Sequence, residues 1–265
     1  MKHKTENIRL TLILFLAFAS LFYACQKETE MDEFPGSLIV ELRESFVNNE
    51  RIPALYVVTQ EEFPCANFYI DYTYSHADGQ RKIRFNRLVL PGNCLTAFGR
   101  AKAFIELESM SEGIHPVYFE VNKNELLTEF HLDEDSLTVD MPLGKIGSIL
   151  FAENIMYRLP DKYVWGYIHA KAPQSHNDYS QFFQQLLEAG AEEKHLEPGN
   201  YGFFRIDEES FVLFVHEMHF HPETPFVLLF DNDFEILTDI AYGLNDDFVI
   251  VLYSAKGDVY HNQQP

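Results

Sequence analysis

Imidazole and carboxylate side chains alternate at the end of an apolar segment, residues 211–221, in the second half of the chain. If this segment continues as a strand, one of its faces carries Glu217, His219 and His221. Nitrogen and oxygen donors of this kind bind zinc and similar ions, so the pattern predicts a metal site to which His169 can add a further ligand. The alternative is that these polar residues leave the core before Pro222 and bind nothing.

Motifs for other catalytic chemistry are missing from the sequence. It contains no Gly-x-Ser-x-Gly segment to present a nucleophilic serine, and no glycine-rich loop to bind phosphate. Asp231–Asp233 and Asp133–Asp135 match calcium loops over only a few residues, and turn or helix-cap roles explain them better. We therefore expect a protein that is not an enzyme and needs no cofactor, with zinc or calcium as the ions to consider. The alternative is a metal-dependent or carboxylate hydrolase in the C-terminal half.

Four basic residues lie close together in a chain that has 41 acidic and 20 basic residues. They are Arg81, Lys82, Arg84 and Arg87. Such a cluster can bind an acidic glycan or a protein partner, or it can simply balance neighbouring acids. Exposed tyrosines such as Tyr69 or Tyr118 can stack on sugar rings, although core packing explains most tyrosines equally well. The formal charge of -21 excludes nucleic acid as a partner, because such a surface repels phosphate backbones.

The basic cluster belongs to a predicted β-hairpin. Residues 67–75 and 82–90 both have strand character, and Asp78-Gly79 between them is a strong turn signal. A hairpin centred on this loop pairs residues whose numbers add up to 159, which places Ile70 opposite Val89 and Tyr72 opposite Arg87. The same register brings Cys65 opposite Cys94, so we predict a disulfide across the open end of the hairpin.

The N-terminus has the features of an export signal. Three basic residues, Lys2, Lys4 and Arg9, precede the apolar run from Leu10 to Cys25. This run of about 15 residues is shorter than the roughly 20 that a membrane-spanning helix needs. Residues 1–24 are therefore predicted to be a removable signal peptide. Its removal changes the formal charge to -23, because three basic residues and one acidic residue are lost.

The junction at Ala24-Cys25 resembles the lipobox of bacterial lipoproteins, although Phe22 and Tyr23 depart from the residues that the family prefers. The resemblance implies lipidation of Cys25. Residues 25–34 resemble the acidic tether of surface lipoproteins from Bacteroidota-type bacteria, which implies an anchor in the outer membrane or at the cell surface. The alternative is a soluble secreted protein cut after Ala19.

Two folded units are expected. Alternating apolar residues over short segments predict an immunoglobulin-like β-sandwich at residues 35–142, without the Cys-Trp-Cys pattern of antibody domains. After a linker at 142–147, residues 148–265 predict a smaller α+β sandwich. Its helices are expected at 177–189, capped by Asn177 or Asp178, and from an Asp233 cap to Gly243.

These features favour a lipid-anchored envelope protein of the binding or interaction type. Its partner is expected to be a glycan or another protein, in addition to the membrane that holds the anchor. The hydrolase described above is one alternative, and a structural or assembly component of the envelope is another. The sequence does not rank a glycan against a protein as the partner.

Overall fold

The computed structural model describes residues 29–31, 33–48, 50–90, 92, 94, 97–140, 149–171, 179–214, 224–244 and 248–262. The predicted signal peptide, Cys25, the 142–147 linker and the predicted metal ligands Glu217, His219 and His221 lie outside these residues. Within the described ranges, no helix has the length and apolar character needed to cross a membrane.

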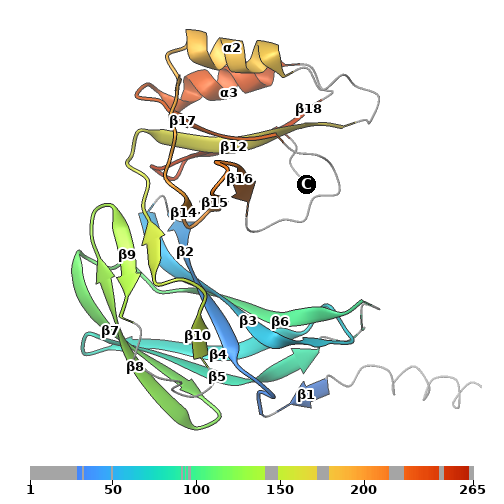
Figure 1. The fold of residues 1–265 in the computed structure, drawn as a ribbon, viewed down its shortest axis with the longest axis vertical. Helices are drawn as coiled ribbons and strands as arrows, with labels where there is room; N and C mark the ends of the chain where they lie inside the picture. Colours follow the sequence, from blue (N-terminus) through green and yellow to red (C-terminus); the bar gives the residue numbers. More distant parts are fainter. Residues whose placement is uncertain are drawn as a thin grey trace, which may run out of the picture.

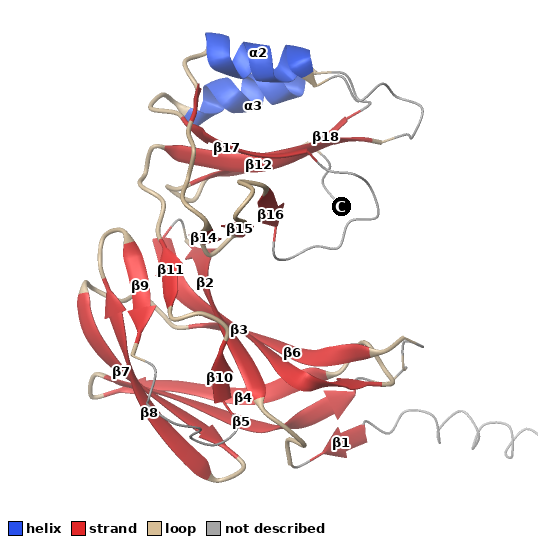
Figure 2. Cartoon of the chain, in the orientation of Figure 1, coloured by secondary structure: helices blue, strands red, loops and turns tan. Residues whose placement is uncertain are grey.

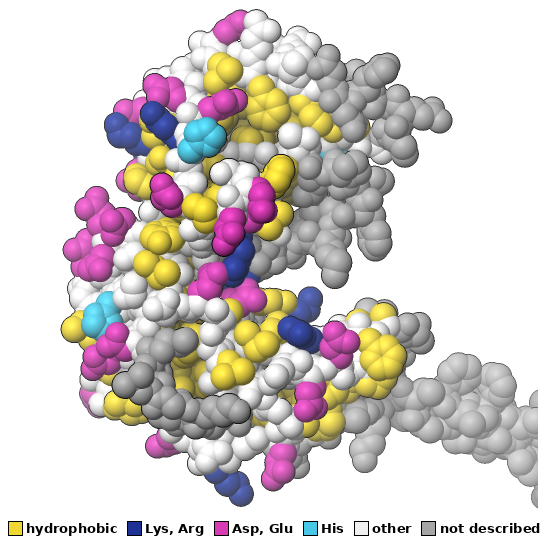
Figure 3. Space-filling view, viewed as in Figure 1, with side chains coloured by type: hydrophobic (Ala, Val, Ile, Leu, Met, Phe, Trp, Pro, Cys, Tyr) yellow, Lys and Arg dark blue, Asp and Glu magenta, His cyan; other side chains and the backbone are white. Residues whose placement is uncertain are grey.

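The described residues form two β-rich lobes (Figures 1 and 2). The N-lobe comprises β1 to β11, and the C-lobe comprises β12 to β19 together with α2 and α3. The prediction of a mainly β protein with a helical layer in its second half is therefore confirmed. In the space-filling view the lobes are separated by a notch on one side, and acidic side chains lie over both of them (Figure 3).

The N-lobe is built on a single continuous sheet. Its strands are β1 (Thr29–Met31), β2 (Leu38–Val47), β3 (Glu50–Phe63), β4 (Tyr69–Ala77), β5 (Gln80–Leu90), β6 (Gly99–Glu106), β7 (Gly113–Val121), β8 (Asn124–Leu132), β9 (Ser136–Val139), β10 (Ile149–Phe151) and β11 (Ile155–Tyr157). The sheet order is β10-β2-β3-β6-β4-β5-β7-β8-β9-β11, and β1 pairs with β5. Apolar residues at alternate positions, as in β8, point to one shared core.

This sheet bends so that its two halves pack face to face around the core. The ring of Phe151 on β10 lies 5.8 Å from that of Phe119 on β7 and 6.2 Å from that of Phe130 on β8. β10 pairs with β2 at one edge, and β11 pairs with β9 at the other. The N-lobe therefore continues to Tyr157, which corrects the predicted boundary at 142–147. β10 and β11 have only three residues each, so their sequences contain no alternating pattern long enough to assign them to the N-lobe.

The hairpin of β4 and β5 is confirmed, but its predicted register is wrong. Asp78 and Gly79 form a two-residue turn with φ angles of 53° and 75°, so Tyr74 pairs with Ile83. A β-bulge between Asp71 and Tyr72 then shifts the pairing by one residue, which puts Arg87 opposite Asp71 and Leu88 in the core. The predicted disulfide is present, with 5.2 Å between the Cα atoms of Cys65 and Cys94.

The C-lobe contains an antiparallel sheet in the order β13-β17-β12-β18-β19. The strands are β12 (Tyr163–Ala170), β13 (Glu192–Glu193), β17 (Thr224–Leu229), β18 (Phe248–Ser254) and β19 (Val259–His261). α2 (Ser180–Glu188) and α3 (Phe234–Gly243) cover one face of it (Figure 1). Asp233 caps α3 as predicted, by accepting a hydrogen bond from the amide of Glu235. α2 begins after Tyr179, which provides no side-chain cap.

A small second sheet covers the other face of the C-lobe sheet. It consists of β14 (Gly199–Asn200), β15 (Phe204–Ile206) and β16 (Val212–Phe214). Trp165 of β12 is fully buried there and packs against Phe203 and Phe204. Phe46 of β2 also stacks on Phe203, at a ring distance of 4.9 Å. The tip of an N-lobe strand therefore enters the core of the C-lobe.

Buried polar groups add to the connection between the lobes. The fully buried carboxylate of Glu44 accepts hydrogen bonds from Arg158, at 2.8 Å, and from Arg51, at 3.1 Å. Arg158 lies at the start of the chain segment that enters the C-lobe. The side chain of Asn200 donates to the carbonyl oxygen of Leu42, at 2.9 Å. The lobes therefore share both apolar and hydrogen-bonded contacts.

Candidate ligand-binding pocket

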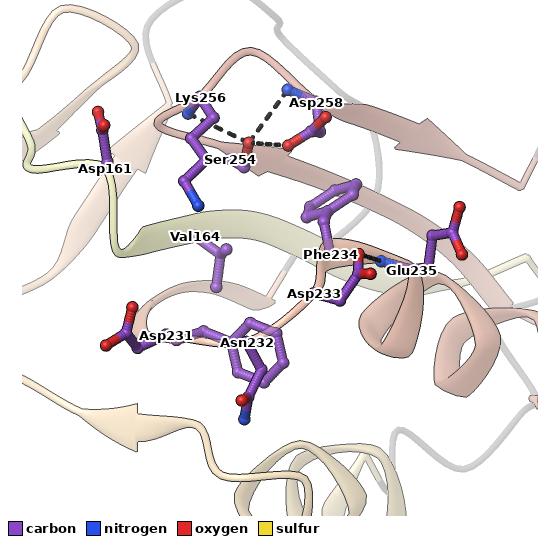
Figure 4. A pocket seen from close by; sticks show the side chains of 11 residues that line it. Asp161, Val164, Asp231, Asn232, Asp233, Phe234, Glu235, Ser254, Lys256 and Asp258 are labelled. Carbon is purple, nitrogen blue, oxygen red and sulfur yellow. Dashed lines mark hydrogen bonds between the residues drawn. The ribbon is translucent and has the colours of Figure 1, made fainter.

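A pocket of about 560 Å³ lies at the edge of the C-lobe sheet (Figure 4). Three separate segments contribute to it: the start of β12, the turn between β17 and α3, and the turn between β18 and β19. Its lining residues are Asp161, Val164, Phe230, Asp231, Asn232, Asp233, Phe234, Glu235, Ser254, Lys256 and Asp258. Pockets of a few hundred cubic ångströms are typical for small ligands.

The turn between β18 and β19 brings the one basic lining residue to the pocket. The hydroxyl of Ser254 donates to the carboxylate of Asp258, at 2.7 Å, and accepts from the amides of Lys256 and Asp258. These bonds fix the turn, and the side chain of Lys256 extends from it over Val164 (Figure 4). Because the Ser254 hydroxyl is fully engaged, we assign it a structural role and not that of a nucleophile.

Several pocket carboxylates also have structural partners. Asp231 pairs with Lys162, at 2.5 Å, and Asp233 caps α3. The side chain of Asn232 donates to the carbonyl oxygen of Ala189, at 3.2 Å. This agrees with the prediction that the Asp231–Asp233 segment serves as a turn and helix cap. The remaining acceptor oxygens, together with Lys256 and the apolar side chains of Val164 and Phe234, can contact a polar ligand that also has apolar faces.

The basic cluster predicted on the hairpin is largely paired with acids. Arg81 is only 3% exposed, and it donates to the carbonyl oxygens of Leu107 and Ser109. Lys82 contacts Glu120 and Glu125, both at 2.9 Å. Hydrogen bonds to Glu125 and Glu120 raise the pKa of Lys82, and those from Lys82 and Arg84 lower the pKa of Glu120.

The other two members of the cluster are paired as well. Arg84 contacts Glu120, at 3.0 Å, and Arg87 contacts Asp71, at 3.4 Å. Lys82 and Arg84 line a hollow of about 190 Å³ with Thr73 and Ser75. Asp71 lies on β4, the predicted hairpin partner of β5. Glu120 and Glu125 come from β7 and β8, which the sequence did not show to be neighbours of the hairpin.

The predicted metal-site residues are only partly described. His169 on β12 is 9% exposed and stacks with Tyr167, which in turn packs against Phe214 at the end of β16. His169 therefore lies near the strand that leads into residues 215–223. Glu217, His219 and His221 themselves lie outside the described part of the chain. Within that part, metal-binding donor atoms converge at Glu129, His131 and Asp140, which belong to the N-lobe.

No pattern in the sequence indicates that Asp161, Lys256 and Asp258 belong to one site. They lie in turns far apart in the chain, without a shared motif or spacing. Their proximity depends on β12 lying between β17 and β18 in the sheet. No family model, curated protein or solved structure matches this chain.

Proposed function

We propose that this is a lipid-anchored envelope protein that binds a hydroxyl-rich ligand, such as a glycan fragment, in the C-lobe pocket. The observation that supports this most directly is the pocket itself. Its lining combines charged and polar side chains with the apolar side chains of Val164, Phe230 and Phe234, of which Val164 and Phe230 are mostly buried. A sugar presents hydroxyl groups at its edges and C–H groups on its faces, so both parts of the pocket have a matching contact.

The shape and charge of the pocket also indicate which ligand is favoured. A concave site of about 560 Å³ suits a small ligand better than a protein surface, since protein interfaces are broad and extend over many residues. Five carboxylates and one lysine line the pocket, so an acidic sugar is disfavoured. We therefore propose neutral or amine-bearing glycans as the ligand class.

The proposed anchor rests on the N-terminal sequence. Cys25 is the proposed site of lipidation, and the outer membrane or cell surface is the proposed location. We propose a tether shorter than the predicted residues 25–34, because β1 begins at Thr29 and pairs with β5. Phe34 is buried and exchanges two hydrogen bonds of 3.0 Å with Asn122. Three residues, 26–28, then separate Cys25 from the folded N-lobe.

An immunoglobulin-like arrangement of residues 35–142 also stays a proposal. Face-to-face packing of the two halves of the sheet supports it. The parallel pairing of β5 with β7, and the continuity of the sheet across both halves, argue for a different strand order. The metal-dependent form of the hydrolase alternative depends on Glu217, His219 and His221, which lie outside the described residues. Its carboxylate form would use acids such as those of the C-lobe pocket, but Asp231, Asp233 and Asp258 have the structural partners described above.

The ligand proposal is tested with residues 26–265 on an array of neutral, amine-bearing and acidic glycans. Hits are then measured by calorimetry with Lys256→Ala and Asp258→Asn variants. We expect at least tenfold weaker binding for Lys256→Ala and unchanged binding for Lys102→Ala, an exposed lysine on β6. Equal affinity of the Lys256→Ala and wild-type proteins, or the absence of any glycan hit, would contradict the proposal.

The anchor is tested separately by labelling expressing cells with radioactive palmitate. We expect label in the wild-type protein and none in a Cys25→Ser variant. Label that persists in this variant would show that another residue carries the lipid.

A further inference from the structure

Three side chains with metal-binding atoms share the outer face of the N-lobe sheet. Glu129 and His131 are separated by one residue on β8, so both point away from Phe130, which is fully buried in the core. Asp140 follows β9, and its amide donates to the carbonyl oxygen of Glu129, at 3.0 Å. Asp140 is therefore the cross-strand neighbour of Glu129 and lies diagonally across from His131.

The distances between the donor atoms suit a single ion. The Nε2 atom of His131 lies 3.4 Å from Oδ2 of Asp140 and 3.9 Å from Oε2 of Glu129. One donor atom from each of the three residues fits within a mutual distance of 4.8 Å. Metal–ligand bonds of about 2.0–2.1 Å at a tetrahedral zinc ion place two ligand atoms roughly 3.4 Å apart. A bound ion would require side-chain rotations that draw the three donor atoms, now within 4.8 Å of one another, to this spacing.

The state of His131 is a second, independent indication. The side chain of His131 is 33% exposed, but its Nε2 atom is inaccessible to solvent and makes no hydrogen bond among the described residues. The largely exposed carboxylates of Glu129 and Asp140 lie beside this atom. An occluded ring nitrogen without a hydrogen bond is costly, and coordination to a cation satisfies it. His76 is different, because its ring nitrogen makes an ordinary hydrogen bond with the single carboxylate of Glu108, at 3.0 Å.

The surrounding sheet holds these residues in place. Across β7, β8 and β9, His131 lies between Ile114 and Thr138, and Glu129 is opposite Pro116. Ile114 and Pro116 give the cluster an apolar neighbour on one side. The hydroxyl of Thr128 donates to the carbonyl oxygen of Asp140, at 2.6 Å, which fixes the backbone of the third residue.

We propose that Glu129, His131 and Asp140 bind a divalent transition-metal ion of the zinc type. Two carboxylates balance the charge of the ion, and the imidazole supplies the nitrogen donor that distinguishes zinc from calcium. Calcium prefers six to eight oxygen ligands, which three side chains do not supply. This site lies in the N-lobe and is distinct from both the C-lobe pocket and the segment that contains His219 and His221.

The test measures zinc binding to residues 26–265 by calorimetry in metal-free buffer. His219→Ala and His221→Ala are introduced together in all samples, so that this second histidine group does not obscure the result. We expect one equivalent of zinc to bind. Adding His131→Ala, or the isosteric Asp140→Asn, is expected to weaken binding at least tenfold, whereas adding His76→Ala leaves it unchanged.

Circular dichroism establishes that each variant is folded, and Glu129→Gln provides an additional variant with almost no change in volume. The proposal is overturned if the His131→Ala and His76→Ala proteins bind zinc equally. It is also overturned if calcium competes with zinc at equal concentration, because that would indicate carboxylate binding without a role for the imidazole.

Discussion

At the level of single residues, Glu44 carries the clearest structural role. Its carboxylate is fully buried between Arg51 and Arg158 at the junction of the lobes. Glu44→Gln leaves two partly buried guanidinium groups without their counter-charge, and loss of one partner from a buried ion pair typically costs about 3–5 kcal/mol. We expect a loss of this size in urea unfolding. Glu106→Gln, an exposed residue that accepts from Ser45, is the control and should change stability by less than about 1 kcal/mol.

Tyr201 predicts a dependence of stability on alkaline pH. Burial, and then the neighbouring Tyr157, raise the pKa of Tyr201 from 10.0 to about 12. The folded protein therefore holds this proton more tightly than the unfolded chain does. The contribution of Tyr201 to stability is constant below pH 10 and falls as the pH rises from 10 to 12, by up to about 3 kcal/mol.

Denaturant unfolding at pH 8, 10, 11 and 12 tests this prediction. The Tyr201→Phe protein should lose less stability over this range than the wild-type protein. It should still lose some, because Tyr74, whose pKa is also raised to about 12, and Tyr56, Tyr72 and Tyr260, whose pKa values are raised by burial, still titrate. Identical pH profiles for the two proteins would show that the hydroxyl of Tyr201 ionises as easily in the folded protein as in the unfolded chain.

At the level of secondary structure, much of the fold was predictable. Alternating apolar residues identified most of the longer strands, and the spacing at Phe182 and Leu186 identified α2, both residues being buried. The Cys65–Cys94 disulfide was predicted even though the assumed register was wrong, because the bulge partly reverses the shift made by the turn and leaves the pairing near the cysteines displaced by only one residue. A single inserted residue leaves no pattern in the sequence, so the bulge and the position of Arg87 were not predictable.

The proposed metal site and the acids that neutralise the basic cluster were less predictable, because both depend on which strands are neighbours in the sheet. Glu129 and His131 are two residues apart, but Asp140 joins them only through the pairing of β8 with β9. Likewise, the acids that neutralise Lys82 and Arg84 reach them through the parallel pairing of β5 with β7. Which strands become neighbours is determined by packing of the whole core, and a pattern within one short segment of the sequence does not predict it.

Gly166 allows two strands of the C-lobe to approach each other closely, because it has no side chain. A Cβ atom at this position in β12 would lie 2.0 Å from the carbonyl oxygen of Val251 in β18. Gly166→Ala must therefore separate paired strands, and we expect a loss of at least about 3 kcal/mol in calorimetric unfolding. Gly243→Ala at the end of α3 meets no atom within 4 Å and should be close to neutral. Comparable melting temperatures for the two variants would contradict this account.

At the level of the whole molecule, the short connection from Cys25 to β1 places the N-lobe near the proposed membrane. Four residue steps from Cys25 to Thr29 span about 14 Å at most. β1 pairs with the last residues of β5, and the connection from β5 to β6 carries Phe98, which directly precedes β6 and is 77% exposed. We therefore expect Phe98 to approach the lipid in the anchored protein, whereas Tyr242 on α3 of the C-lobe stays distant.

Fluorescence quenching in vesicles of lipids with brominated acyl chains measures this distance. The lipidated Phe98→Trp protein should show quenching of its added tryptophan, and the lipidated Tyr242→Trp protein should not. The native Trp165 is fully buried and contributes a constant background. Mass spectrometry of the N-terminal peptide establishes lipidation first, so that a missing lipid and a distant Phe98 give different results.

The attachment of β1 also has a mechanical consequence. Its three residues pair with β5 and Met31 is only partly buried against the core, whereas Phe34 is fully part of the core at 4% exposure. A force pulling the protein away from its anchor would detach β1 before it disturbed this core. Residues 29–33 would then join the extended chain, and its reach would grow from about 14 Å to roughly 30 Å. A small force would thus move the C-lobe pocket outward while the disulfide-linked hairpin and the core of the N-lobe remained folded.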